Sequence, residues 1–146
     1  MSSITQYMQQ RHRDCDDLFA RAETSADGGN WTDTTALWTE FSAKMEQHLC
    51  MEEQVLFPAF ENETGHTQGP TAVMRMEHEQ MRALMKELVT CVNNEDRERF
   101  LGLAESLLLL IQQHNMKEEQ MLYPMTDQAL NDVDSVLTRM QTLGEA

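Results

Sequence analysis

The chain has 146 residues, a net charge of −14 and 40% hydrophobic residues. This length suits one domain with its own core, and no apolar window of about 18 residues is present that could span a membrane. The acidic balance argues against a nucleic-acid partner, which needs a clustered basic face. The start of the chain has no apolar signal region. The three cysteines of the chain are odd in number and widely spaced, which argues against a disulfide framework. We therefore expect a cytoplasmic protein without a membrane or nucleic-acid partner.

Apolar residues recur every three or four positions through five segments, and this spacing predicts helices rather than strands. The segments are residues 3–25, 32–58, 71–92, about 97–123 and about 130–143. Thr32 or Asp33 is the expected N-cap of the second helix, and Pro58 and Pro124 should kink or interrupt the second and fourth. Four long helices with short connections predict an all-α fold. We expect an antiparallel up-down-up-down four-helix bundle with a short extra C-terminal helix packed outside.

The chain contains an internal repeat with an offset of 66 residues. Residues 48–58 and 114–124 are identical at six of eleven positions, which include a His-x-x-x-Glu-Glu-Gln run and a final proline. His12 and His78 obey the same offset. Self-similarity of this kind indicates repeated structural units. We interpret residues 1–146 as one domain made of two like helix hairpins, at about 1–66 and 67–132.

Polar residues interrupt the apolar face of two of these helices. Residues four positions apart lie on the same helix face, so His114 and Glu118 should point toward the side that Ile111 and Met121 mark as buried, and the first repeat has the same pair. A carboxylate on a buried face is costly unless it is paired or binds a metal. The inward polar groups of the whole chain are His12, His48, Glu52, His78, His114 and Glu118.

Four imidazoles and two carboxylates suit a pair of first-row transition-metal ions, and bundle cores are where two-metal carboxylate sites occur. A single buried His–Glu pair is more often an ordinary hydrogen bond. Two such pairs and two further histidines in one repeat register are hard to explain in that way. In our hypothesis the two histidines of the first repeat bind one metal, the two of the second repeat bind the other, and the two glutamates bridge the metals.

Other metal templates fit the chain less well. Ferritin-like sites use Glu-x-x-His on two helices, and the match from Glu63 to His66 lies in a glycine-containing loop. A zinc protease needs His-Glu-x-x-His on a helix, and the run that starts at His78 has Arg82 in the last position. Tetrahedral zinc with three protein ligands would leave half of the candidate set unused.

Taken together, these motifs resemble the hemerythrin-like, or HHE cation-binding, domains over almost the full chain. The resemblance rests on Arg11-His12, His48-x-x-x-Glu52-Glu53 with Leu56-Phe57-Pro58, Glu77-His78, and His114-x-x-x-Glu118-Glu119 with Leu122-Tyr123-Pro124. It implies a non-haem di-iron site inside a four-helix bundle, with two irons per chain, an oxo or hydroxo bridge, and the six inward residues as ligands.

One departure from oxygen-carrying hemerythrins concerns a fifth histidine ligand, which forms a His-x-x-x-His pair on their third helix. Here the positions four before and four after His78 are Met74 and Arg82, and His66 lies in a loop. The set of four histidines and two glutamates is similar to that of di-iron proteins that repair iron–sulfur clusters after damage by nitric oxide or oxidants. Those proteins typically carry an additional N-terminal domain with a cysteine motif, which this chain does not show.

The resemblance implies a protein that binds or reacts with a small diatomic ligand or peroxide (O2, NO or H2O2), in oxidative or nitrosative stress or in sensing. The alternatives are an iron donor for damaged iron–sulfur centres, and a structural or interaction bundle with a non-redox metal. No general acid or base stands out beyond the ligand set, so we assign no catalytic residue. Whether the protein is an enzyme, and its oligomeric state, stay open.

Residues beside the candidate ligands have simpler interpretations. Glu53 and Glu119 lie about 100° around the helix from the ligand glutamates, so we expect them on a solvated face. Asp16, four residues after His12, is either an acceptor that orients the imidazole or a surface residue. Tyr123 is one position past the inward face and should be a packing residue. The same two interpretations as for Asp16 apply to Glu77 and Glu79.

Overall fold

The computed structural model describes residues 3–145 of the chain, and no strand occurs among them. The elements, in chain order, are α1 (Ile4–Asp27), α2 (Trp31–Met51), η1 (Glu52–Leu56), α3 (Phe57–Thr64), α4 (Pro70–Asn93), α5 (Arg97–Lys117), η2 (Glu118–Leu122), α6 (Tyr123–Ala129) and α7 (Val133–Glu145). The elements η1 and η2 are short π-helical segments, in which a backbone N–H bonds the carbonyl five residues earlier. The predicted all-helical fold is confirmed. None of the described helices has the length and apolarity that a bilayer span requires.

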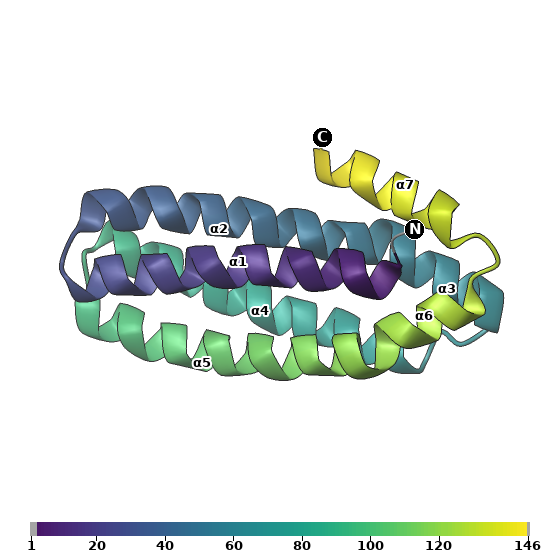
Figure 1. Ribbon diagram of the computed structural model, residues 1–146. Coiled ribbons are helices and arrows are strands. Elements are labelled where there is room, and N and C mark those ends of the chain that lie inside the picture. Colours follow the sequence, from purple (N-terminus) through teal and green to yellow (C-terminus); the bar gives the residue numbers. More distant parts are fainter. Residues whose placement is uncertain (1–2, 146) are drawn as a thin grey trace.

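The long helices α1, α2, α4 and α5 lie side by side and form the body of a helical bundle (Figure 1). α1 packs against α2 and α5, and α4 packs against the same two helices. Tight turns join α1 to α2 and α4 to α5 at one end, while α3 and α6 continue from α2 and α5 at the other end (Figure 1). α7 packs against α2 and η1.

Short polar side chains and a glycine set several helix ends. Ser3 begins α1 with a capping box, in which its hydroxyl oxygen accepts from a backbone N–H of the first turn. The N-cap of α2 is Asn30, and the predicted cap at Thr32 or Asp33 is wrong. Asn30 Oδ1 accepts from the Asp33 backbone N–H at 3.2 Å, so the cap of α2 lies two or three residues earlier than expected. Gly65, at φ 72°, ends α3 in the left-handed conformation that glycine adopts readily.

A layer of polar side chains divides the apolar core into two clusters. One cluster lies toward the α1–α2 turn and includes Cys15, and the other lies toward α3, α6 and α7 and includes Met8. On α1 the buried His12 falls between these two residues. The buried histidines of α2, α4 and α5 fall at the same boundary. Apolar side chains therefore enclose the polar layer at both ends.

Pro58 and Pro124 do not end their helices. Each proline follows a π turn, and the helical path continues through α3 and α6. Proline has no backbone N–H to donate, and it is tolerated here because it occupies the first turn of the new α-helical segment. The predicted interruption of the α-helical pattern is therefore a change of hydrogen-bond register rather than a stop.

The prediction that Met121 is buried is wrong, because its side chain is 62% exposed. The residue that corresponds to it in the first repeat is Val55, which is buried on η1, the element against which α7 packs. The corresponding side of η2 faces solvent at Met121. The packing of α7 therefore makes Val55 and Met121 differ in solvent exposure, although the repeat makes the two positions equivalent.

Candidate metal centre

Four histidines and two glutamates converge in the polar layer, and all six side chains are buried. Each long helix supplies one imidazole, and each π turn begins with one glutamate. The residues are His12 on α1, His48 on α2, His78 on α4, His114 on α5, Glu52 on η1 and Glu118 on η2. The structure thus brings together all six side chains that the sequence predicts as ligands.

The Nε2 atoms of the imidazoles face the carboxylates. His78 Nε2 lies 3.1 Å from Glu52 Oε1, and His114 Nε2 lies 3.2 Å from Glu118 Oε1. His12 Nε2 lies 3.2 Å from the same Glu118 oxygen. Among residues 3–145, two groups have ligand atoms close enough to hold a metal ion: the histidines of the second repeat with both glutamates, and the histidines of the first repeat with Glu118.

Several atoms of the site have no hydrogen-bond partner within the described chain. They are Glu52 Oε1, His78 Nε2, His114 Nε2 and Glu118 Oε2. Their short mutual distances lack hydrogen-bond geometry, and a buried polar atom without a partner costs about 1–3 kcal/mol. A cation placed among these lone pairs would compensate that cost. Nitrogen and oxygen donors of this kind suit first-row transition metals, so the residues present fit a metal site.

The second π turn, η2, explains how the site acquires an additional side chain, Tyr123. In an α-helix this residue would lie about 140° around the axis from Glu118, five positions earlier. The i→i+5 bond from the Tyr123 N–H to the Glu118 carbonyl brings the two side chains back toward the same face. The Tyr123 hydroxyl lies 2.7 Å from Glu52 Oε2, 2.8 Å from Glu118 Oε1 and 3.2 Å from His12 Nε2. The prediction that Tyr123 only packs is therefore wrong, and the signal that could have found it is a proline within a helical pattern.

Three further carboxylates hold the outer nitrogens of three imidazoles. The pairs are Glu119 with His12 Nδ1 at 2.6 Å, Glu53 with His78 Nδ1 at 2.6 Å, and Glu77 with His114 Nδ1 at 2.8 Å. Such a partner fixes the tautomer and the ring orientation of a metal-binding histidine. The prediction that Glu53 and Glu119 lie on a solvated face is wrong. Their rotation away from the ligand glutamates points them at the seam with a neighbouring helix, and the sequence signal for this was the Glu-Glu pair in both repeats.

Cations support two of these carboxylates in turn. Arg82 donates to Glu53 at 2.8 Å and 3.0 Å, and Lys117 pairs with Glu77. Arg82 stands four residues after His78, about one turn further along α4. At this position the chain has a group that supports the carboxylate partner of His78.

Burial and neighbouring charges shift the pKa values of the site. Burial, together with the adjacent Glu118 carboxylate, raises the pKa of Glu52 to about 7. Burial also favours neutral Glu118, but His114 and the surrounding hydrogen bonds hold the pKa of Glu118 well below its usual value. Burial lowers the pKa of His48 to about 4, whereas carboxylates led by Glu118 overcome burial and raise the pKa of His114 to about 9. At neutral pH His48 therefore has a free lone pair, while His114 must release a proton to bind a metal.

The remaining residues that the sequence singled out lie away from the centre. Asp16 is exposed on α1 and makes no hydrogen bond to His12 within the described chain, which favours the surface interpretation. His66 is exposed in the loop before α4, as expected. Glu79 is exposed and pairs with Arg82 at 2.9 Å.

Comparison with known families identifies the class of protein. Residues 3–126 match the Hemerythrin HHE cation binding domain. Because this match spans most of the chain, the chain belongs to that family, and the resemblance inferred from the His-x-x-x-Glu-Glu motifs is confirmed. No curated protein and no solved structure matches the chain.

Proposed function

We propose that this chain holds two iron ions in the polar layer. There it would bind or react with O2, NO or H2O2, in oxidative or nitrosative stress or in sensing. The observation that carries the proposal is the set of buried Nε2 and carboxylate oxygen atoms that lack partners and face one another. Membership of a cation-binding family supports it.

The division of the ligands follows the repeat. The two histidines of the first repeat serve one ion and the two of the second repeat serve the other. Glu118 and Glu52 are the proposed bridges, and Glu118 lies within reach of both groups of histidines. Iron held by this set would supply redox chemistry toward a small molecule.

The side chains around the ligands orient them and hold a proton. Glu53, Glu77 and Glu119 accept from Nδ1 of three imidazoles and so direct each Nε2 to the centre. Tyr123 keeps its hydroxyl proton, since burial and the nearby carboxylates raise its pKa well above the usual value. Phe57 stacks on His78 with ring centroids 5.6 Å apart and adds apolar cover.

We further propose a cytoplasmic location. Cys15, Cys50 and Cys91 are free thiols, and a reducing compartment keeps thiols in that state.

Exposure of the reduced, iron-loaded protein to each small molecule tests the proposed function. A reversible change in the optical spectrum with one equivalent of O2 or NO would support binding. Consumption of NO or H2O2 beyond the protein concentration would support a reaction. An iron-loaded protein whose spectrum responds to none of the three would contradict the proposal.

A further inference from the structure

The four imidazoles of the centre differ in the hydrogen-bond partner of their Nδ1 atom. Three have a carboxylate on Nδ1, whereas His48 Nδ1 is buried and has no hydrogen-bond partner within the described chain. By the offset of 66 residues, His48 corresponds to His114, whose Nδ1 partner is Glu77. The residue that corresponds to Glu77 is Arg11. A cation therefore occupies the position at which the other repeat supplies an acceptor.

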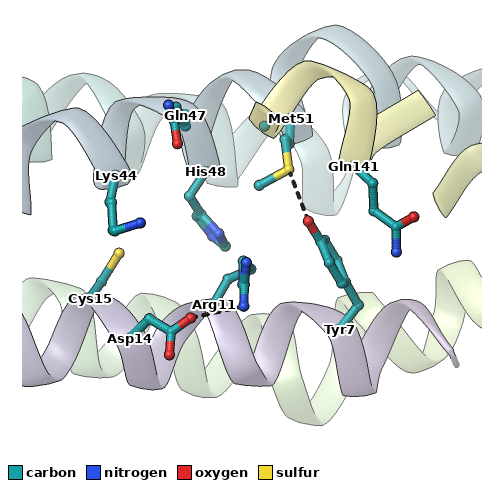
Figure 2. A pocket seen from close by; sticks show the side chains of 10 residues that line it. Tyr7, Arg11, Asp14, Cys15, Lys44, Gln47, His48, Met51 and Gln141 are labelled. Carbon is teal, nitrogen blue, oxygen red and sulfur yellow. Dashed lines mark hydrogen bonds and ion pairs between the residues drawn. The ribbon is translucent and has the colours of Figure 1, made fainter. Parts of the chain in front are cut away.

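A cavity of about 350 Å³ adjoins His48 between α1, α2 and α7. Figure 2 shows Arg11 extending toward it from α1, Lys44 and His48 from α2, and Gln141 from α7. Arg11 Nε, like His48 Nδ1, is buried and has no partner within the described chain. Two buried nitrogen donors and one ammonium group thus line the same cavity without an acceptor for the donors.

We propose that this cavity binds a small carboxylate or a carboxylate-like oxyanion, which accepts hydrogen bonds from His48 Nδ1 and Arg11 Nε. A buried donor without an acceptor is costly, and hydrogen bonds to an ionised acceptor are stronger than those to a neutral one. The volume lies in the range of small-molecule sites.

The charges that line the cavity favour an anion. Arg11 and Lys44 contribute two positive charges and Asp14 contributes one negative charge. The Asp14 carboxylate is already engaged, because Arg11 pairs with it at 2.8 Å and Gln10 donates to it at 2.9 Å. Arg11 makes this ion pair through Nη2, and its buried Nε has no partner within the described chain. In a chain with a net charge of −14, this is a local positive site.

The bound anion has at His48 the role that the Glu77 carboxylate has at His114, and unlike Glu77 it can exchange with solvent. It fixes the ring of His48 as Glu77 fixes the ring of His114, and it does so at the one imidazole of these four whose Nδ1 has no partner within the described chain. The inference rests on the proposed function in one point, namely that His48 Nε2 is a metal ligand and Nδ1 therefore carries the proton.

Calorimetric titration of the metal-loaded full chain with sodium acetate tests the site, with sodium chloride holding ionic strength constant. The parent chain should bind acetate saturably. Arg11→Met should weaken binding at least tenfold, and Arg11→Glu should abolish it, because the new carboxylate takes the acceptor position. Arg13→Met is the matched control, since Arg13 is exposed two residues away on the same helix, and it should bind acetate like the parent chain.

Acetate binding that is unchanged in Arg11→Met would place the anion elsewhere and overturn the inference, as would the absence of saturable binding in the parent chain. If Arg11→Met fails to fold, a crystal structure of the parent chain with acetate decides. A carboxylate oxygen at hydrogen-bond distance from His48 Nδ1 supports the site, and water alone there refutes it.

Iron content is measured in parallel. A parent chain without iron contradicts the proposed function, whereas iron without acetate binding contradicts only this inference.

Discussion

Replacement of Tyr123 by phenylalanine tests how the centre orients its carboxylates. The Tyr123 hydroxyl lies between Glu52 Oε2, at 2.7 Å, and Glu118 Oε1, at 2.8 Å. The corresponding residue of the first repeat is Phe57, which follows a π turn of its own. The chain thus already accommodates phenylalanine in this backbone setting, and Tyr123→Phe should remove one hydroxyl with little change in packing.

The size of the effect follows from the hydrogen bonds. A hydrogen bond to a charged group contributes about 1.5–3 kcal/mol. The Tyr123 hydroxyl has a single hydrogen, so one such bond is lost. At about 1.4 kcal/mol for each factor of ten, the affinity for iron should fall about 10- to 100-fold, which is the usual effect of removing a group that orients metal ligands.

Competition with a chromophoric chelator in the absence of oxygen measures this affinity. Tyr7→Phe is the matched control, because within the described residues the Tyr7 hydroxyl hydrogen-bonds only to Met51 Sδ, at 3.8 Å. The iron affinity of this variant should stay close to that of the parent chain. An iron affinity of Tyr123→Phe equal to that of Tyr7→Phe would mean that the Tyr123 hydroxyl contacts the carboxylates without orienting them for the metal.

Three further predictions concern a carboxylate that supports an imidazole, the effect of pH, and the apolar core. Glu119→Gln should lower iron affinity about tenfold or more in the chelator assay by weakening the acceptor of an imidazole, whereas Glu40→Gln, exposed on α2, should leave it unchanged. Apparent metal affinity should rise between about pH 6 and 9, because the metal displaces protons from Glu52 and His114, whose pKa values are raised to about 7 and about 9. Without metal, the same raised pKa values mean that the folded chain binds more protons than the unfolded chain. The free energy of unfolding in urea with chelator should therefore fall over this range, and a rise would contradict the sign of these shifts. Leu107→Ala should lower the free energy of unfolding by about 2–5 kcal/mol while the number of metals per folded chain stays the same.

The sequence predicts the helices and the six candidate ligands because both depend on local spacing. An interval of four residues places His114 and Glu118 on one helix face whatever surrounds the helix, and the offset of 66 residues repeats that pair in the first half. Burial then selects the inward face. An ideal α-helix inferred from periodicity alone is therefore accurate enough to predict these features.

The supporting residues depend on features that periodicity does not contain. The π turn moves Tyr123 onto the inner face, and a prediction built on 3.6 residues per turn places it outside. Glu53 and Glu119 are rotated about 100° around the helix axis from the ligand glutamates. A side chain at that angle faces solvent or a neighbouring helix, depending on how the helices pack. Met121 differs from Val55 only because α7 packs against η1. These predictions were wrong because helix packing or the backbone hydrogen-bond register sets the position of each side chain, and neither is contained in the sequence period.

The metal content of each folded chain shows whether the six inward side chains hold two metal ions. The protein should be purified without oxygen and analysed by elemental mass spectrometry, together with Glu118→Ala and His66→Ala. We expect two irons in the parent chain and in His66→Ala, and fewer in Glu118→Ala. A parent chain with no iron, a single tightly held zinc ion, or loss of metal in His66→Ala would rule out the proposed di-iron site.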